Sequence, residues 1–477
     1  MSDDIATLWD AGLDPAARES LQQQLHGRVR AAILSGALPR GERVPASRAL
    51  AGRLGVARIT VTQAYDQLVA EGYLETRHGA GTFVAAETPD QLLATAPSNT
   101  AVPSHQETSK RPLYSGMPAL DQFPTARWGR LAGRAARALD ESLMHHSDVM
   151  GYAPLRSTLA RHLQASRNLV CTPDQIMIVS GLQQGLFLVG SAALAPDGAI
   201  IMEDPGYSGM RAAAEATRRR LAFTGVDASG ALPPECGKGL LVTSPSRHYP
   251  LGYTMPHARR LELLAWARET GSLIFEDDYD SEFRYAGRPL NSLQGIDGGE
   301  HVVYGGTFSK TLFPAIRLGY LVLPHGLIEA VRRFRAATDS FPSIVHQAAL
   351  HLFIEEGDFA RHIRRLRKVH AARHSAFMTA ANAYLTPYFD IEPSDAGLSI
   401  LAWPRACLSA LDLSDDTLAA RARAHGIGAV ALSHAYRDAT PKQGVIFGFA
   451  NLEEDEIAAN VRAFARSLAR ETGFSTG

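Results

Sequence analysis

The stretch HVVYGGTFSKTLFPAIRLGY, residues 301 to 320, is the most informative part of this chain about its fold. It begins with an apolar run of β-branched and aromatic residues that ends in the pair Gly305 and Gly306. Polar side chains follow, with a lysine at position 310 and an arginine at position 317. This order is typical of a buried strand in an open α/β sheet, with polar groups on the loop after its C-terminal end.

A second stretch, SLIFEDDYDSEFR at residues 272 to 284, has the same character. Its apolar run leads into Asp277 and Tyr279. Because the carboxyl ends of parallel strands meet at one edge of a sheet, the two stretches would bring four kinds of group together. These are an amine, a carboxylate, a phenol and a guanidinium.

These four groups are the set that holds the cofactor pyridoxal phosphate (PLP). Lys310 would form the imine, Asp277 would keep the pyridine nitrogen protonated, and Tyr279 would bond the ring oxygen. The phosphate would be held by Arg317, Thr307 and Ser309. A Ser-Lys pair alone is common, and a lone lysine is more often a solvated surface group, so the prediction rests on the combination.

The composition sets outer limits on the kind of protein. A length of 477 residues predicts two or three domains, and the net charge of −1 gives no overall attraction to nucleic acid, although a local basic region is compatible with it. The cysteines, Cys171, Cys236 and Cys407, form no CxxC pair, so neither a disulfide framework nor a metal site is predicted. With no signal-peptide pattern and no apolar run long enough to span a bilayer, we expect a cytoplasmic protein without a membrane partner.

The segment from Arg18 to Ala86 has the pattern of three helices followed by a β-hairpin. Apolar residues at helical spacing run from Leu21 to Leu34, and a second helix is expected with Ser47 as its N-cap. A third helix should run from about Ile59 to Gly72, and the two short β runs are Tyr73 to Thr76 and Gly81 to Val84. Together these elements predict a winged helix-turn-helix.

The charge of this segment favours DNA binding. It contains nine arginines, no lysine and five acidic residues, for a net charge of +4. Arginines on a solvated surface would be the simpler explanation of the charge alone. The positions favour DNA, because the N-terminal turn of a recognition helix reaches base edges and a wing glycine allows close approach to the backbone. The candidate DNA contacts are Arg48, Arg58, Thr60, Thr62 and Gly79.

Two resemblances extend this interpretation. The sequence AAILSGALPRGERVPASRALAGRLGVARITVTQAYDQLVAEGYLETRHGAGTFV, residues 31 to 84, resembles the GntR family of DNA-binding domains. The motifs EDDYDSEFRY, GTFSK and RLGY resemble more narrowly the MocR/GabR family of regulators. That family joins a GntR-type winged helix to a fold-type-I aminotransferase-like domain. The resemblance covers nearly all of the chain except its N-terminal tail and one internal stretch.

The resemblance implies an α/β architecture with an N-terminal winged helix-turn-helix and a PLP-dependent transferase-like domain. We expect a DNA-binding domain at residues 1–86 and an effector domain at 112–477. Residues 87–111, rich in Ser, Thr, Pro and Ala, are predicted to form a flexible linker. In the effector domain, residues from about Phe341 onward resemble a small C-terminal subdomain, to which residues 112 to 138 would contribute an N-terminal piece.

Alternating apolar runs predict the strands and helices of the large subdomain. The expected strands are Gln175–Val179, Ala199–Glu203, Gly239–Thr243, Ser272–Glu276 and Val302–Gly305, and the expected helices include Gly185–Ala195 and Met255–Thr270. After the first of these strands, SGLQQG at residues 180 to 185 resembles the phosphate loop of the family, which implies that Leu182 and Gln183 contact the phosphate. The resemblance also implies that Tyr207 stacks on the pyridine ring, whereas a core tyrosine in a turn is the simpler alternative.

Several positions depart from the family pattern. Arg247 and His248 stand where His-Gln is usual, and Tyr249 replaces an asparagine that reaches the ring oxygen in aminotransferases. His146 replaces a tyrosine that reaches the phosphate in the partner subunit. The arginine that binds substrate carboxylates is absent, with Val445–Phe447 in its place. Arg437 is a nearby candidate for an effector carboxylate, although a solvent-facing loop arginine is the simpler interpretation.

The sequence therefore predicts a PLP-dependent transcriptional regulator that senses PLP, an amine or an amino acid through an aldimine at Lys310. The resemblance implies a domain-swapped, head-to-tail homodimer bound to a double-stranded DNA operator. No catalytic turnover is required for such a switch. Two alternatives stay open, an active aminotransferase with an appended DNA-binding domain and a GntR-type regulator whose large domain binds a ligand without PLP.

Overall fold

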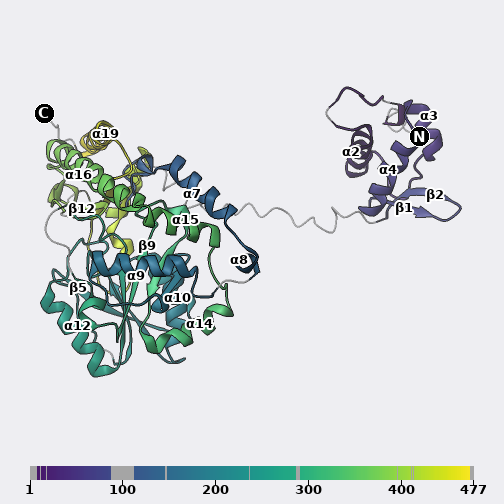
Figure 1. Cartoon of the computed structure of the whole chain (residues 1–477). Coiled ribbons are helices and arrows are strands. Elements are labelled where there is room, and N and C mark those ends of the chain that lie inside the picture. The colour runs from purple at the N-terminus through teal and green to yellow at the C-terminus, as the bar shows by residue number, and fades with distance from the viewer. Residues whose placement is uncertain are drawn as a thin grey trace. The chain divides into compact units, whose positions relative to one another are not determined.

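The computed structural model describes residues 8–10, 12–17, 19–86, 112–145, 148–235, 237–285, 291–394, 396–409, 411 and 413–472. The chain divides into two compact units, Met1–Pro103 and Ser104–Gly477 (Figure 1). The predicted linker at 87–111 lies outside the described residues, and so do His146 and Cys236. The boundaries 1–86 and 112–477 therefore remain predictions.

The N-terminal unit has the three helices and the hairpin that the sequence predicts. They are α2 (Leu21–Leu34), α3 (Ser47–Leu54), α4 (Arg58–Ala70), β1 (Leu74–Arg77) and β2 (Gly81–Val84). The strands pair antiparallel, with Leu74 opposite Val84. Ser20 caps α2 by accepting a hydrogen bond from the Gln23 backbone N–H at 3.3 Å. The apolar faces of the three helices pack together to form the core of this unit, and Trp9, from the segment before α2, packs against them.

One predicted cap in this unit was wrong by one residue. Ala46 is the N-cap of α3, and Ser47 is the first helical residue. The Ser47 hydroxyl instead accepts a hydrogen bond from Arg58 Nε at 3.4 Å. This contact joins the N-terminal ends of α3 and α4. Helix α4 also lacks a side-chain cap, because Ala57 stands at its N-cap position.

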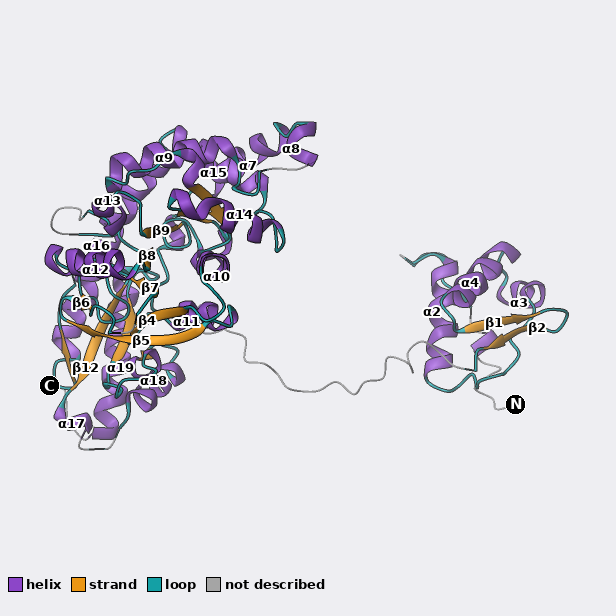
Figure 2. Ribbon diagram, turned by 90° about the horizontal axis from the view of Figure 1, so that it is seen from below, coloured by secondary structure: helices purple, strands orange, loops and turns teal. Residues whose placement is uncertain are grey.

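The larger unit contains an eight-stranded sheet in the order β3-β10-β9-β8-β7-β4-β5-β6 (Figure 2). Strands β5, β4, β7, β8 and β9 run parallel, and β10 is antiparallel between β3 and β9. The bounds are β3 (Ile176–Val179), β4 (Ala199–Asp204), β5 (Arg220–Asp227), β6 (Gly230–Ala231), β7 (Gly239–Thr243), β8 (Leu273–Asp278), β9 (Val302–Thr307) and β10 (Gly319–Val322). All five predicted strands are present, and β8 and β9 each extend two residues further than predicted.

Helices cover both faces of this sheet. Successive side chains of a strand point to opposite faces, and those of β3 pack into two different apolar clusters. Ile176 and Ile178 of β3 face one cluster of apolar side chains, whereas Met177 and Val179 face another. The first face carries α7 (Thr125–Arg137), α9 (Ala153–Arg167) and α15 (Ile344–Glu355), with α12 (His257–Thr270) and α13 (Leu293–Asp297) beside the neighbouring strands. The second carries α10 (Leu182–Ala193), α11 (Ser208–Ala216) and α14 (Ile328–Ala336). The short helix α8 (Glu141–His145) follows α7 in the chain.

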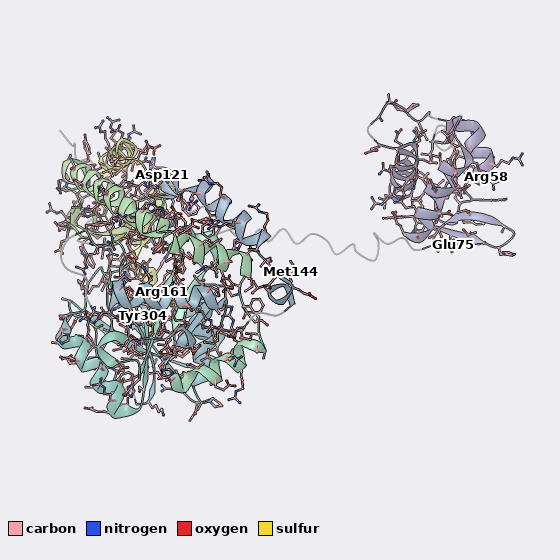
Figure 3. The ribbon with its side chains drawn as sticks, viewed as in Figure 1. Arg58, Glu75, Asp121, Met144, Arg161 and Tyr304 are labelled. Atoms are coloured by element: carbon pink, nitrogen blue, oxygen red, sulfur yellow. The ribbon has the colours of Figure 1, made fainter. Side chains whose placement is uncertain are left out.

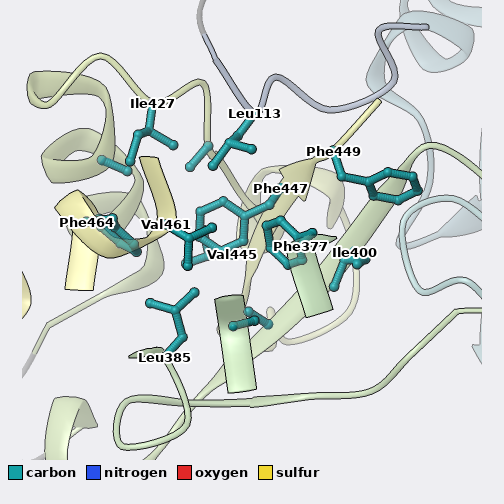
Figure 4. Close-up of a cluster of buried hydrophobic side chains, with 14 of the residues drawn as sticks. Leu113, Phe377, Leu385, Ile400, Ile427, Val445, Phe447, Phe449, Val461 and Phe464 are labelled. Carbon is teal, nitrogen blue, oxygen red and sulfur yellow. The ribbon is translucent and has the colours of Figure 1, made fainter. Parts of the chain in front are cut away.

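A second, four-stranded antiparallel sheet builds the small subdomain. Its order is β11-β12-β14-β13, with bounds β11 (Phe389–Ile391), β12 (Ser399–Pro404), β13 (Val430–Ala431) and β14 (Val445–Gly448). Its helices are α16 (Asp358–Tyr384), α17 (Ala406–Ser409), α18 (Asp415–Ala424) and α19 (Glu454–Thr472). Phenylalanines from α16, β14 and α19 form the core between them (Figure 4).

The N-terminal piece of the small subdomain is shorter than predicted. Leu113 and Ala119 belong to its core, and Leu113 O accepts a hydrogen bond from the backbone N–H of Gly448 at 2.7 Å. Helix α7, however, packs through Trp128 and Leu131 into the apolar cluster on one face of the eight-stranded sheet. The predicted assignment of residues 112 to 138 was therefore right for the first part only. The predicted start of the small subdomain at about Phe341 was too early, because α15 packs on the eight-stranded sheet. Among the described helices, none combines the length and apolar character needed to cross a membrane.

Candidate functional site

Lys310 lies in the loop between β9 and β10, beside the chain segment that precedes α7. Its Nζ donates a hydrogen bond to Gly116 O at 2.6 Å. Gly116 has φ +75°, and a Cβ atom there would lie 3.1 Å from Lys310 Nζ, so a glycine is required for this close approach. Burial lowers the pKa of the Lys310 amine, while Asp280 and Asp277 act in the opposite direction. A lowered pKa favours the neutral amine, which is the nucleophilic form.

Asp277 stands near the end of β8, on the strand next to the one that leads to Lys310. In the parallel register of β8 and β9, Asp277 is opposite Gly305. Its Oδ1 is buried and has no hydrogen-bond partner among the described residues. Burial raises the pKa of Asp277 to about 8, and the nearby carboxylates of Asp278, Glu203 and Asp280 add to the increase. A buried carboxyl in this state is suited to a cationic N–H donor, which would restore its charged form.

Tyr279 follows directly after β8. Its hydroxyl is buried beside Arg247 and Asp280, which both interact with it, and it makes no hydrogen bond of good geometry among the described residues. Burial raises the pKa of Tyr279 well above its ordinary value, Asp280 adds to the increase, and Arg247 opposes it. Buried polar atoms are normally paired, so the unpartnered Oδ1 of Asp277, next to this phenol, points to a ligand with a matching group. The donors and acceptors expected for a pyridine nitrogen and a ring oxygen are therefore present at this edge.

The N-terminus of α10 supplies a place for an anion. Gly181, with φ +137°, is its N-cap, and no side chain caps the helix. A Cβ atom at Gly181 would lie 3.5 Å from both terminal nitrogens of Arg317, so this guanidinium lies over the helix start. Unpaired backbone N–H groups, the helix dipole and a guanidinium together favour a phosphate. The sequence predicted that α10 begins at Gly185, whereas it begins at Leu182, and this shift brings Leu182 and Gln183 into its first turn.

The remaining predicted cofactor contacts are placed as follows. The Gln183 side chain donates to Gly209 O at 2.9 Å, so its backbone N–H is the group that it can offer to an anion. Thr307 Oγ1 accepts a hydrogen bond from the Ser309 backbone N–H at 3.1 Å, and both residues are half-buried. Tyr207 is the N-cap of α11 and has 47% of its surface exposed, and its ring packs edge-on against Tyr249 at 5.5 Å between centroids.

A network missed by sequence reasoning holds the end of β8 in place. Tyr304, labelled in Figure 3, donates a hydrogen bond to Asp278, which also pairs with Arg167 Nε at 3.4 Å. Arg167 also pairs with Glu282 at 3.2 Å. Arg167 lies on α9, far from β8 in sequence, so no local pattern indicated this contact. The network fixes the backbone next to Asp277.

In the N-terminal unit, four of the predicted DNA contacts lie in the first turns of α3 and α4, and the fifth, Gly79, lies in the wing. Arg48 and Arg58 are exposed, and the Arg58 guanidinium is held near the start of α3 by Ser47. The Thr62 hydroxyl donates to Arg58 O at 3.0 Å, and Thr60 is half-exposed. Gly79 has φ +73° at the tip of the wing, with open space around it.

Comparison with known proteins finds a family that matches the N-terminal unit and relatives that match nearly the whole chain. The model of the family "Bacterial regulatory proteins, gntR family" matches residues 21–84. The chain is 36% identical over 470 residues to the probable rhizopine catabolism regulatory protein MocR of Rhizobium meliloti, covering 94% of each protein. It is 33% identical to the pyridoxine biosynthesis transcriptional regulator PdxR of Corynebacterium glutamicum, over 93% of this chain and 95% of that protein. The chain belongs to the MocR family of transcriptional regulators.

Solved structures similar to this MocR-family chain are aminotransferases. Kynurenine aminotransferase from Pyrococcus horikoshii matches with a TM-score of 0.66 and 25% identity, over 75% of this chain and 90% of that one. A multiple-substrate aminotransferase from Thermococcus profundus matches with a TM-score of 0.69 and 24% identity, over 81% and 98%. The large unit therefore has the aminotransferase fold, with its large and small subdomains.

Arg247, the departure from the family's His-Gln pattern, joins the two subdomains of this MocR-family member. Only 4% of the residue is exposed, and Nη2 donates to Ser399 O in β12 at 2.8 Å. Nη1 lies 3.7 Å from Asp280, and a Cβ atom at Gly397 would lie 2.5 Å from Cζ. The sequence signalled that this position is unusual but not what it contacts.

Arg437 takes part in a second junction between the subdomains, through its backbone. The carboxylate of Asp204, at the end of β4, accepts hydrogen bonds from the backbone N–H groups of Arg437 and Asp438, both at 2.8 Å, and Ala439 at 2.6 Å. The Arg437 side chain is exposed. Asp204 lies three residues before Tyr207, so this loop of the small subdomain is close to the predicted ring-stacking position. Sequence reasoning missed the role of Asp204.

Proposed function

We propose that this regulator uses PLP, bound at Lys310, as the part of its effector domain that senses a small molecule. The observation that carries the proposal is the grouping of three side chains at adjacent strand ends. They are a lysine whose pKa is lowered, a buried carboxyl with one unpartnered oxygen, and a buried phenol. When bound, PLP supplies an aldehyde that joins an amine reversibly. An effector amine, an amino acid or PLP itself is the expected ligand class.

Each residue then has a defined task. Asp277 holds a proton on the pyridine nitrogen, and Tyr279 donates to the ring oxygen. Arg317, the hydroxyls of Thr307 and Ser309 and the start of α10 bind the phosphate. Tyr207 stacks on the ring, and Arg437 is the candidate for an effector carboxylate.

The regulatory part of the proposal concerns DNA and assembly. The winged helix binds a double-stranded operator through Arg48, Arg58, Thr60, Thr62 and the wing at Gly79. A ligand can shift this activity only if it binds two states of the protein unequally. We further propose a domain-swapped, head-to-tail homodimer acting in the cytoplasm. The similarity to the pyridoxine biosynthesis transcriptional regulator PdxR of Corynebacterium glutamicum supports a small metabolite as effector.

The test is chemical trapping of the cofactor. The full chain is incubated with PLP, treated with borohydride, digested and examined by mass spectrometry. We expect a reduced adduct at position 310 and an absorbance band from the imine, both lost in Lys310→Ala. Lys238→Ala, which changes an exposed lysine, is the matched control and should keep both signals. A colourless protein with no adduct at position 310 would overturn the proposal.

An active aminotransferase is the second candidate, favoured by the aminotransferase fold and the lowered pKa of Lys310. Tyr249 and the absent arginine at positions 445 to 447 weigh against it. Incubation of the PLP-loaded chain with amino acids and 2-oxo acids separates the two, because only a working enzyme accumulates new amino acid over many turnovers.

A further inference from the structure

Ile59 is the second residue of α4, and 60% of it is exposed. The other large apolar side chains of this helix, Val61, Tyr65 and Leu68, are buried in the core of the unit, and Val69 is half-buried. A single exposed apolar residue on a surface is ordinary and needs no explanation. The position of Ile59 within the recognition helix gives it a possible role.

The residues around Ile59 are arranged for contact with DNA. Arg58 precedes it and is held by Ser47 at 3.4 Å, and Thr62 is tied to the backbone of Arg58 at 3.0 Å. No side chain caps α4, because its N-cap is Ala57. The first turn of the helix therefore presents backbone N–H groups, a guanidinium and one exposed branched apolar side chain together. In a winged helix-turn-helix this turn faces the base edges of the major groove.

We propose that Ile59 reads thymine, by packing against the C5-methyl group of a thymine in each half-site. The thymine methyl is the one apolar group that a base pair displays in the major groove. Arg58 and the threonines can satisfy hydrogen-bonding groups of bases or phosphates, but the isoleucine side chain cannot. Its chemistry therefore selects an A·T pair at its position. The proposal rests on the DNA-binding part of the proposed function and adds a residue that determines sequence preference.

The experiment removes the methyl group from the DNA and the side chain from the protein in a double-mutant cycle. Operator sequences are first selected by the full-length protein from a random duplex library. Each thymine is then replaced singly by deoxyuridine, which keeps the base pair and lacks only the methyl. Affinities are measured by fluorescence anisotropy at one fixed salt concentration for the wild type and for Ile59→Ala. Leu34→Ala is the matched control, since Leu34 is a 46% exposed apolar residue at the end of α2.

At one thymine in each half-site, we expect uracil to weaken binding of the wild type about fourfold, the effect of about one buried methyl-sized group. The same replacement should leave Ile59→Ala unchanged, and Leu34→Ala should behave like the wild type. If uracil has no effect at any thymine, or weakens both proteins equally, the proposal is overturned. If the wild type selects no sequence at all, the DNA-binding part of the proposed function fails, and this proposal fails with it. Equal thermal melts of the variants confirm that each one is folded.

Discussion

The substitution Asp277→Asn should stabilise the protein without PLP at alkaline pH and at the same time impair its ability to hold PLP. Burial raises the pKa of Asp277 to about 8, from an ordinary value near 3.8. A group whose pKa is higher in the folded state contributes stability that is fully present below the unfolded pKa. That contribution is lost as the pH rises through the folded pKa. For Asp277 the window of loss is therefore from about pH 4 to pH 8.

The size of the effect follows from the difference in pKa. A difference of about four corresponds to about 6 kcal/mol at about 1.36 kcal/mol for each pKa step, which is an upper limit. Water that enters the site would relieve part of the cost of burial. An asparagine has nearly the same shape and no charge at any pH. We therefore expect Asp277→Asn to be more stable than the wild type by about 2–4 kcal/mol at pH 8, and about equal in stability near pH 4.

The assay is urea unfolding of the full chain without PLP, followed by circular dichroism at pH 5, 6, 7 and 8. Glu203 and Asp280, whose pKa values burial raises to about 7 and about 6, are present in both proteins, so the difference between the two slopes reports Asp277 together with its coupling to these two carboxylates. Asp174→Asn is the control, because its side chain is 91% exposed. Equal slopes for the wild type and Asp277→Asn would refute the reasoning. The same variant should lose PLP on dilution, since an amide cannot hold the pyridinium charge.

Four further substitutions test other contacts. Arg58→Ala should weaken operator binding by about 1–3 kcal/mol with PLP retained, measured by anisotropy. Asp204→Ala leaves three backbone N–H groups of the small subdomain without their acceptor and should cost about 2–4 kcal/mol in urea unfolding, more than Asp204→Asn. Arg247→Met removes one partner of a buried ion pair and should cost about 3–5 kcal/mol. Gly116→Ala places a Cβ 3.1 Å from Lys310 Nζ and should reduce the imine absorbance.

The parts of the site that the sequence predicted depend on local patterns. Lys310 and Asp277 could be placed at one edge because each follows an apolar run, and parallel strands end on the same side of a sheet. The winged helix was predictable from helical spacing and from the glycines of its turns. Errors arose where a boundary depends on backbone conformation. The start of α10 follows a glycine with φ +137°, and the cap of α3 depends on the dihedral angles of Ala46.

The contacts that the sequence did not predict join residues far apart in the chain. Arg247 contacts Ser399, and Asp204 contacts the loop at Arg437. The partners in each contact are far apart in the sequence, so no periodic pattern of residues could indicate them. The Arg167 to Asp278 pair is of the same kind. Such contacts depend on how helices and strands pack in three dimensions, and the sequence alone gave only the unusual residue at position 247.

These long-range contacts also indicate where a ligand could act on the rest of the effector domain. Arg247 binds the small subdomain and lies beside Asp280, one residue after Tyr279. Asp204, which lies three residues before Tyr207, binds the loop of the small subdomain at Arg437. Both junctions thus begin at the strand ends that carry the proposed cofactor contacts. A ligand that changes the charge or position of those contacts would therefore also change the two junctions, and it would shift a conformational equilibrium to the extent that it binds two states unequally.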